Sequence, residues 1–230
     1  MKKAFTMLEL VFVIVVVGIL SYFAASGFQR NPLREAADQV VSHIRYTQHL
    51  AMEDDRFFDP KITSPNYWPE SQWQISFSKN DNFADNMPAY LIFRDLDNDG
   101  IVDISANPLH DEIAKDPANS SNYLTGGVTG YSSLDIRTNS FKGTEALNLG
   151  KKYGITDFNL TSTCSSGTKI AFDYLGRPIR GPLTTFNSTP YPTGRLIVND
   201  CNITLISSTR NITITIQPET GYTYISSQNY

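Results

Sequence analysis

The feature that most constrains this chain is an apolar run close to its start. From Phe5 to Ala25 there are 21 residues, and Glu9 is the only charged one among them. As a helix, a run of this length crosses a hydrocarbon core of roughly 30 Å. Lys2 and Lys3 precede it, and positive charges favour the cytoplasmic side of a membrane. The sequence therefore predicts a single crossing of the inner membrane, with the rest of the chain in the periplasm.

Two simpler interpretations compete for this run. One is a secretory signal peptide, with Ala24-Ala25-Ser26 as a small-residue cleavage site. The other is a plain signal anchor. Neither accounts for Glu9, because a charged side chain inside a span costs about 2.5–3.5 kcal/mol on insertion scales and is usually kept for a function.

The residues around Glu9 resemble the processing signal of type IV prepilins and pseudopilins. The shared features are a short basic leader, a small residue, and Phe5-Thr6-x-x-Glu9 opening an apolar helix. In that family a prepilin peptidase cuts before the Phe and methylates the new amine. The resemblance implies a leader of residues 1–4 and cleavage between Ala4 and Phe5, although Ala4 stands where family members usually have Gly.

A role in assembly for Glu9 follows from this resemblance. The new amine at Phe5 of one subunit can pair with Glu9 of a neighbour inside a low-dielectric helix bundle. Each charge alone is costly there, so the pair selects one packing register. The expected partners are therefore other pilins or pseudopilins, bound through the N-terminal helix.

The apolar periodicity continues beyond the membrane run. Pro32 separates the two parts, so we expect a kink or break there. We predict an N-terminal helix over residues 5–57, with a transmembrane segment at about 5–25 and an amphipathic half that packs on a sheet. The amphipathic stripe has spacings of three and four and consists of Leu33, Ala36, Ala37, Val40, Val41, Ile44, Thr47 and Ala51.

Residues 58–230 change to a period of two, which predicts a β-rich periplasmic domain. With the helix, this gives an α+β class, a long helix on an antiparallel sheet as in pilins. Residues 104–160 are rich in Asn, Ser and Gly, and we expect long loops there. The expected strands are 73–78, 89–93, 169–172, 196–198, 203–206, 211–217 and 222–225.

Looser motifs in this domain resemble the H-type minor pseudopilins and related minor pilins. They are Phe93-Arg94-Asp95 before an Asp-rich turn, the stretch 172–178, and the closing stretch 214–222. The expected function is a structural minor subunit of a type II secretion or competence (DNA uptake) machine. The alternatives are a type IV pilus minor pilin, or an exported calcium-binding, adhesin-like β protein with a signal anchor.

The Asp-rich turn matches the front of a calcium loop. The matching positions are Asp95, Asp97, Asp99, Ile101 and Asp103, with Gly100 at the sixth place. Ala106 stands where such loops have a bidentate Glu, and Asp111 or Glu112 are the candidates to fold back and replace it. A tight β-turn that uses Asp and Asn for their backbone hydrogen bonds remains the alternative.

The two cysteines, Cys164 and Cys201, are too few for a zinc site. In an exported chain we expect them to form a disulfide across a separation of 37 residues, with buried free thiols as the alternative. No nucleophile, phosphate-loop or zinc-protease motif is present, so we expect neither an enzyme nor an organic cofactor.

The net charge of −4 does not favour binding of polyanions, but the charge is unevenly spread. Residues 60–136 hold 11 acidic and 4 basic residues, whereas 137–230 hold 5 acidic and 9 basic ones. Only the second part could contact DNA, and solvated surface charges are the simpler interpretation. The candidate contacts are Arg177, Arg180, Arg195 and Arg210.

Overall fold

A computed structural model gives the fold of the chain as two compact units, Met1–Asn31 and Pro32–Tyr230. The overall class is α+β, as the sequence predicts. The residues that the structure describes are 6–27, 30–54, 71–96, 102–104, 111–128, 131–164, 167–181, 183 and 193–229, without the side chains of 24–27 and 193.

In its described residues the first unit contains one helix, α1 (Met7–Gly27). Its large apolar side chains are exposed from Met7 to Phe23. Among the residues that the structure describes, no helix is both long enough and apolar enough to cross a membrane.

The predicted helix over 5–57 is found as two helices. Arg30 and Asn31 lie outside both, and α2 (Pro32–Glu53) begins at the proline. Proline suits the first position of a helix, because the N–H that it lacks would have no partner within the helix there. All eight residues of the predicted amphipathic stripe are buried in α2, so that prediction is confirmed.

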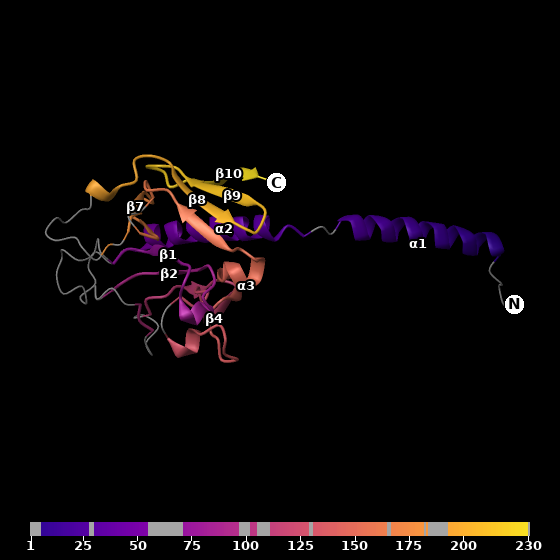
Figure 1. The fold of residues 1–230 in the computed structure, drawn as a ribbon, viewed down its shortest axis with the longest axis horizontal. Helices are drawn as coiled ribbons and strands as arrows, with labels where there is room; N and C mark the ends of the chain where they lie inside the picture. The colour runs from indigo at the N-terminus through magenta and orange to yellow at the C-terminus, as the bar shows by residue number, and fades with distance from the viewer. Residues whose placement is uncertain are drawn as a thin grey trace. The chain divides into compact units, whose positions relative to one another are not determined.

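The second unit contains two four-stranded antiparallel sheets instead of one (Figure 1). The first has the order β2-β1-β6-β7, and its strands are β1 (Gln74–Ser78), β2 (Ala89–Phe93), β6 (Lys169–Phe172) and β7 (Pro178–Arg180). The second has the order β10-β9-β8-β5, and its strands are β5 (Asp157–Leu160), β8 (Cys201–Ile206), β9 (Asn211–Ile216) and β10 (Thr223–Asn229).

The remaining elements are short. Strands β3 (Lys115–Asp116) and β4 (Asn119–Tyr123) form a small antiparallel pair. The short helices are η2 (Asn82–Ala84), η4 (Ser132–Leu134), η5 (Glu145–Leu147), α3 (Leu149–Tyr153) and η6 (Thr193–Arg195).

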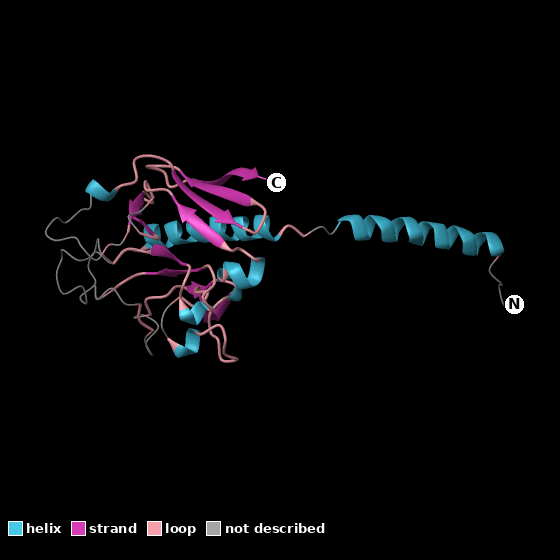
Figure 2. Ribbon diagram, viewed as in Figure 1, coloured by secondary structure: helices cyan, strands magenta, loops and turns pink. Residues whose placement is uncertain are grey.

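Helix α2 contacts both large sheets, so its buried stripe lies at the centre of the domain (Figure 2). Val40 and Ile44 are fully buried there, in one cluster with Phe77 of β1 and Ile214 of β9. This packing explains why the apolar face of α2 is wide, since it covers two sheets and not one.

Three sequence predictions about strands need correction. Strands β3, β4 and β5 lie in the stretch 104–160, where we expected long loops. Strand β7 was not predicted, because its first residue is Pro178 and proline usually argues against a strand. The strand can form because proline is tolerated at the first position of a strand. Residues 196–198 contribute an isolated bridge between Leu196 and Ile179, and not a strand.

Candidate assembly site and acidic loop

The start of α1 carries a reciprocal capping arrangement between Thr6 and Glu9. The Thr6 backbone N–H and its hydroxyl each donate to Glu9 Oε2 at 3.0 Å, and the Glu9 N–H lies 3.3 Å from Thr6 Oγ1. This is a capping box, in which side chains satisfy N–H groups that the first helical turn leaves open. The spacing Thr-x-x-Glu predicts such a cap, whereas the only role expected for Glu9 was pairing between subunits.

The helix that follows this cap presents apolar side chains on every side. Val11, Ile14 and Ile19 are each more than half exposed, as are most of their large neighbours. A helix that is apolar all round is stable only when lipid or protein covers it. The predicted cleavage residues Ala4 and Phe5 lie outside the described residues.

The acidic loop is closed by the carboxylate of Glu112. Glu112 Oε1 accepts from the Leu96 N–H at 2.6 Å, and Oε2 accepts from the Asp103 N–H at 2.7 Å. The Glu112 side chain is 2% exposed, and its own N–H donates to the Asp103 carbonyl at 3.1 Å. Glu112 thus joins the two ends of the loop through backbone groups.

The other described acids of this region differ in their surroundings. Asp95 is buried, and Asp103 accepts a short hydrogen bond from the Tyr131 hydroxyl, which raises the pKa of Tyr131. Asp111 points elsewhere, since it accepts from Tyr123 Oη at 3.1 Å and lies 3.1 Å from Lys115 Nζ.

The structure therefore describes only Asp95 and Asp103 among the predicted calcium ligands. Asp97, Asp99 and Ile101 lie outside the described residues. Within the described part of the chain, no group of three His, Cys, Asp or Glu side chains is arranged to hold a metal ion. Calcium binding stays a prediction.

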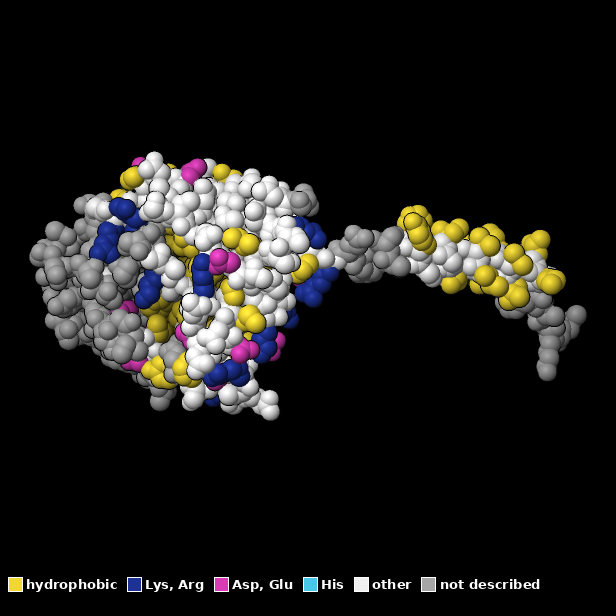
Figure 3. All heavy atoms as spheres, viewed as in Figure 1, with side chains coloured by type: hydrophobic (Ala, Val, Ile, Leu, Met, Phe, Trp, Pro, Cys, Tyr) yellow, Lys and Arg dark blue, Asp and Glu magenta, His cyan; other side chains and the backbone are white. Residues whose placement is uncertain are grey.

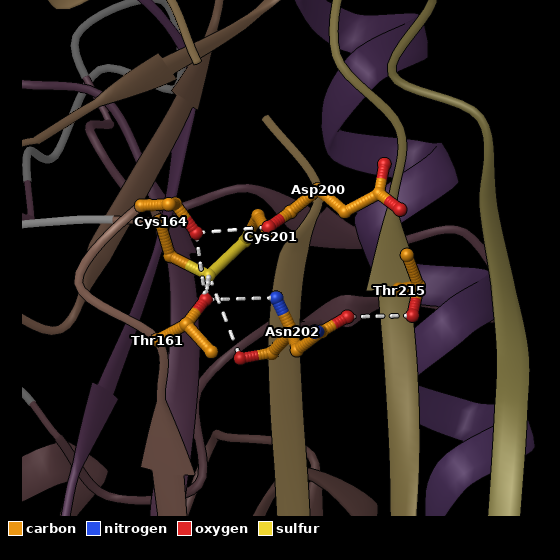
Figure 4. Close-up of a disulfide and its surroundings, with 7 residues drawn as sticks. Thr161, Cys164, Asp200, Cys201, Asn202 and Thr215 are labelled. Carbon is orange, nitrogen blue, oxygen red and sulfur yellow. Dashed lines mark hydrogen bonds between the residues drawn. A yellow bond between two sulfur atoms is a disulfide. The ribbon is translucent and has the colours of Figure 1, made fainter. Parts of the chain in front are cut away.

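The predicted disulfide between Cys164 and Cys201 is present (Figure 4). It ties the turn after β5 to the start of β8, with a Cα–Cα distance of 4.6 Å, and both residues are fully buried. Hydrogen bonds surround it: the Thr161 N–H donates to the Asn202 carbonyl at 3.0 Å, and the Asn202 N–H donates to Thr161 Oγ1 at 3.1 Å.

The four candidate DNA-contacting arginines come from different turns and strands. Arg177 forms an ion pair with Asp173, with Nε 2.7 Å from Oδ2. Arg180 donates to the Gly194 carbonyl at 3.1 Å. Arg195 lies in η6, and Arg210 is exposed in the turn between β8 and β9. On the face in Figure 3 the basic side chains are scattered among acidic and uncharged ones.

A buried polar pair that sequence reasoning missed joins α2 to the first sheet. His43 Nδ1 lies 2.7 Å from Tyr90 Oη, and His43 is 8% exposed. Burial lowers the pKa of His43 from 6.5 to about 4, against a weaker opposite effect of Asp116. The imidazole is therefore neutral at pH 7. Its position next to Ile44 in the apolar stripe could have signalled its burial.

Comparison of the chain with models of protein families, with curated proteins and with solved structures found no match.

Proposed function

We propose that this protein is a structural, non-enzymatic minor pseudopilin subunit of a periplasm-spanning filament machine. The observation that carries the proposal is Glu9, a single carboxylate in the first turn of an exposed apolar helix. The expected pilin-like arrangement of helix and sheets belongs to this proposal. So do cleavage before Phe5 and methylation of the new amine by a prepilin peptidase.

The proposed location is the inner membrane, with the N-terminus cytoplasmic and Pro32–Tyr230 in the periplasm. Its support is the sequence run from Phe5 to Ala25, which extends at both ends past the described side chains. The disulfide agrees with an oxidising compartment such as the periplasm.

The capping box gives Glu9 two distinct roles that substitution can separate. Gln can replace Glu in a capping box, because its side-chain oxygen still accepts from the Thr6 N–H. Gln cannot form an ion pair with the amine of a neighbouring subunit. Glu9→Gln therefore keeps the local cap and loses the proposed contact between subunits.

The test is co-purification of the full chain with its partner subunits from membranes. We expect Glu9→Ala and Glu9→Gln to be inserted and cleaved like the parent but to be lost from the assembled complex. Glu35→Ala, an acid-to-Ala change in the first turn of α2, is the matched control and should assemble normally. Normal assembly of Glu9→Gln would show that the charge is not needed and would contradict the pairing.

The machine served is type II secretion or DNA uptake, and a gel shift of the soluble domain separates them. Phosphate contacts predict retardation of duplex DNA at low salt that falls steeply as salt rises. Since Arg177 is tied to Asp173, we expect Arg180→Ala with Arg210→Ala to reduce any such binding more than Arg177→Ala does. No retardation of DNA at low salt would favour secretion.

A further inference from the structure

Both edges of the first sheet are covered by other parts of the chain. An uncovered edge strand offers unpaired N–H and C=O groups to any passing chain, so proteins cover or charge such edges. Leu196 bridges to β7 through Ile179. The outer edge of β2 is bridged at three places, by Ala89 with Asn148, Leu91 with Thr125 and Phe93 with Ile113.

The second sheet has one guarded edge, at β5. Asp157, the first residue of β5, lies 2.5 Å from Lys79 Nζ, and the same ammonium lies 4.9 Å from the ring centre of Phe158. Charged side chains at an edge oppose pairing with another strand, because pairing would strip their hydration.

The other edge of this sheet, β10, carries no charged side chain of its own, and among the described residues its protection is limited to Arg45 of α2, at Thr223, and a register irregularity between Ile225 and Ser227. In the described part of the chain, β10 pairs with β9 alone. Its seven residues include no proline and no charged side chain, and β8 and β9 also have no charged residue. In Figure 3 the surface in the region of these strands is mostly white, the colour of the backbone and of uncharged polar side chains, with some yellow.

The hydrogen bonds of β10 show where its outer edge becomes available for pairing with another strand. The Gln217 N–H donates to the Tyr222 carbonyl at 2.9 Å, so this carbonyl faces β9. Alternation along the strand then directs the backbone groups of Thr223 and Ile225 outward. Arg45 Nη2 already donates to the Thr223 carbonyl at 2.6 Å. Ile225 is thus the first residue whose outward backbone groups have no partner among the described residues.

We propose that the outer edge of β10 pairs with an extended, uncharged segment of a neighbouring subunit in the assembled machine. The proposal rests on the proposed function and names the contact that the periplasmic domain adds to the helix contact. Backbone pairing supplies the affinity. The partner segment should also be uncharged. Strands β8, β9 and β10 carry no charge that could pair with it, so a charged segment would lose hydration without gaining an ion pair.

A different subunit fits this edge better than a second copy of the chain. The register of β10 shifts between Ile225 and Ser227, in the middle of the strand. Two copies of β10 paired antiparallel over their full length would place their irregular sites opposite each other and interrupt both ladders. A regular strand from another subunit brings no second irregularity.

The first test compares two proline substitutions in the full chain, Ile225→Pro and Leu160→Pro. Ile225 and Leu160 are both partly buried side chains packed on the same core, on opposite edges of one sheet. The Thr161 N–H donates to the Asn202 carbonyl, so the N–H of Leu160 also faces outward. Each proline therefore removes one outward N–H at similar cost to packing.

We expect Ile225→Pro to lower the amount of this protein recovered in the assembled complex about tenfold, because one hydrogen bond between subunits is lost. Leu160→Pro should assemble like the parent. Equal assembly of both variants, or equal loss, would contradict the β10 contact. Failure of the parent itself to co-purify with other subunits would instead contradict the proposed function.

A photoreactive residue at Ser227 provides a second test that does not depend on stability. Asn159 on β5 is the matched control, since both side chains are exposed on edge strands. In native membranes we expect Ser227, and not Asn159, to cross-link to another subunit with a prepilin-type start. An adduct between two differently tagged copies of this chain, or equal cross-linking at both sites, would overturn the proposal.

Discussion

The buried histidine predicts how the stability of the domain depends on pH. His43 has a pKa of about 4 in the folded chain and about 6.5 when unfolded, so the unfolded state binds more protons between these values. Its contribution to stability is complete above pH 6.5 and is lost as the pH falls towards 4. At 1.36 kcal/mol per pH unit, the total loss is roughly 3 kcal/mol.

The assay is chemical denaturation of a fragment starting at residue 30, at pH 7 and at pH 4.5. Carboxylates also titrate in this window, but their effect is common to parent and variant. We expect the parent to lose roughly 2.5 kcal/mol more than His43→Gln between the two pH values. His49→Gln is the matched control, because it makes the same change at an exposed histidine of the same helix.

Equal pH dependence in the parent and in His43→Gln would refute this reasoning. Nuclear magnetic resonance of the His43 ring gives an independent check, since the ring should titrate near pH 4 in the folded fragment. Tyr90→Phe should leave the ring buried and its pKa low, because burial is the main cause of the shift.

Three further predictions concern the same domain. Replacing Cys164 and Cys201 by Ser should lower the free energy of unfolding by roughly 3–4 kcal/mol, and mass spectrometry of non-reduced digests should show the linked peptides. Asp173→Ala should cost about 1–3 kcal/mol in urea melts, because the fully buried Asp173 carboxylate accepts from the Leu175 and Arg177 N–H groups at 3.0 and 2.7 Å, and both would lose their partner. Calcium should raise the melting temperature of the fragment, and Asp97→Ala with Asp99→Ala should abolish that rise; no shift in the parent would leave a plain turn.

The sequence was most informative where side-chain periodicity alone decides burial. The stripe from Leu33 to Ala51 is buried at every predicted position, because a helix that covers two sheets must bury all of its apolar face. The disulfide was predictable for a different reason, since the expectation of export left few alternatives for the two cysteines.

The sequence failed where backbone pairing or tertiary contacts decide the structure. Strand β5 has one fully buried apolar residue, Phe158, which is too weak a pattern to predict a strand. Its backbone pairing with β8 is what makes it one. The division into two sheets also has no local signal, because it depends on which strands pair across long stretches of chain. For the site, Glu9 could be singled out by charge, and Glu112 was one of two candidates to fold back on the acidic loop. Its bonds to the Leu96 and Asp103 N–H groups could not be predicted, because they depend on how distant parts of the chain meet.

The measurement that tests the central proposal most directly is the N-terminal residue of the mature protein. The full chain is purified from membranes of its own cells, and its N-terminal peptide is identified by mass spectrometry. The proposal predicts a peptide that starts at Phe5 with a methylated amine and contains Glu9. A mature chain that starts near Gly27, as after a signal peptide, or one that keeps Met1, would contradict it.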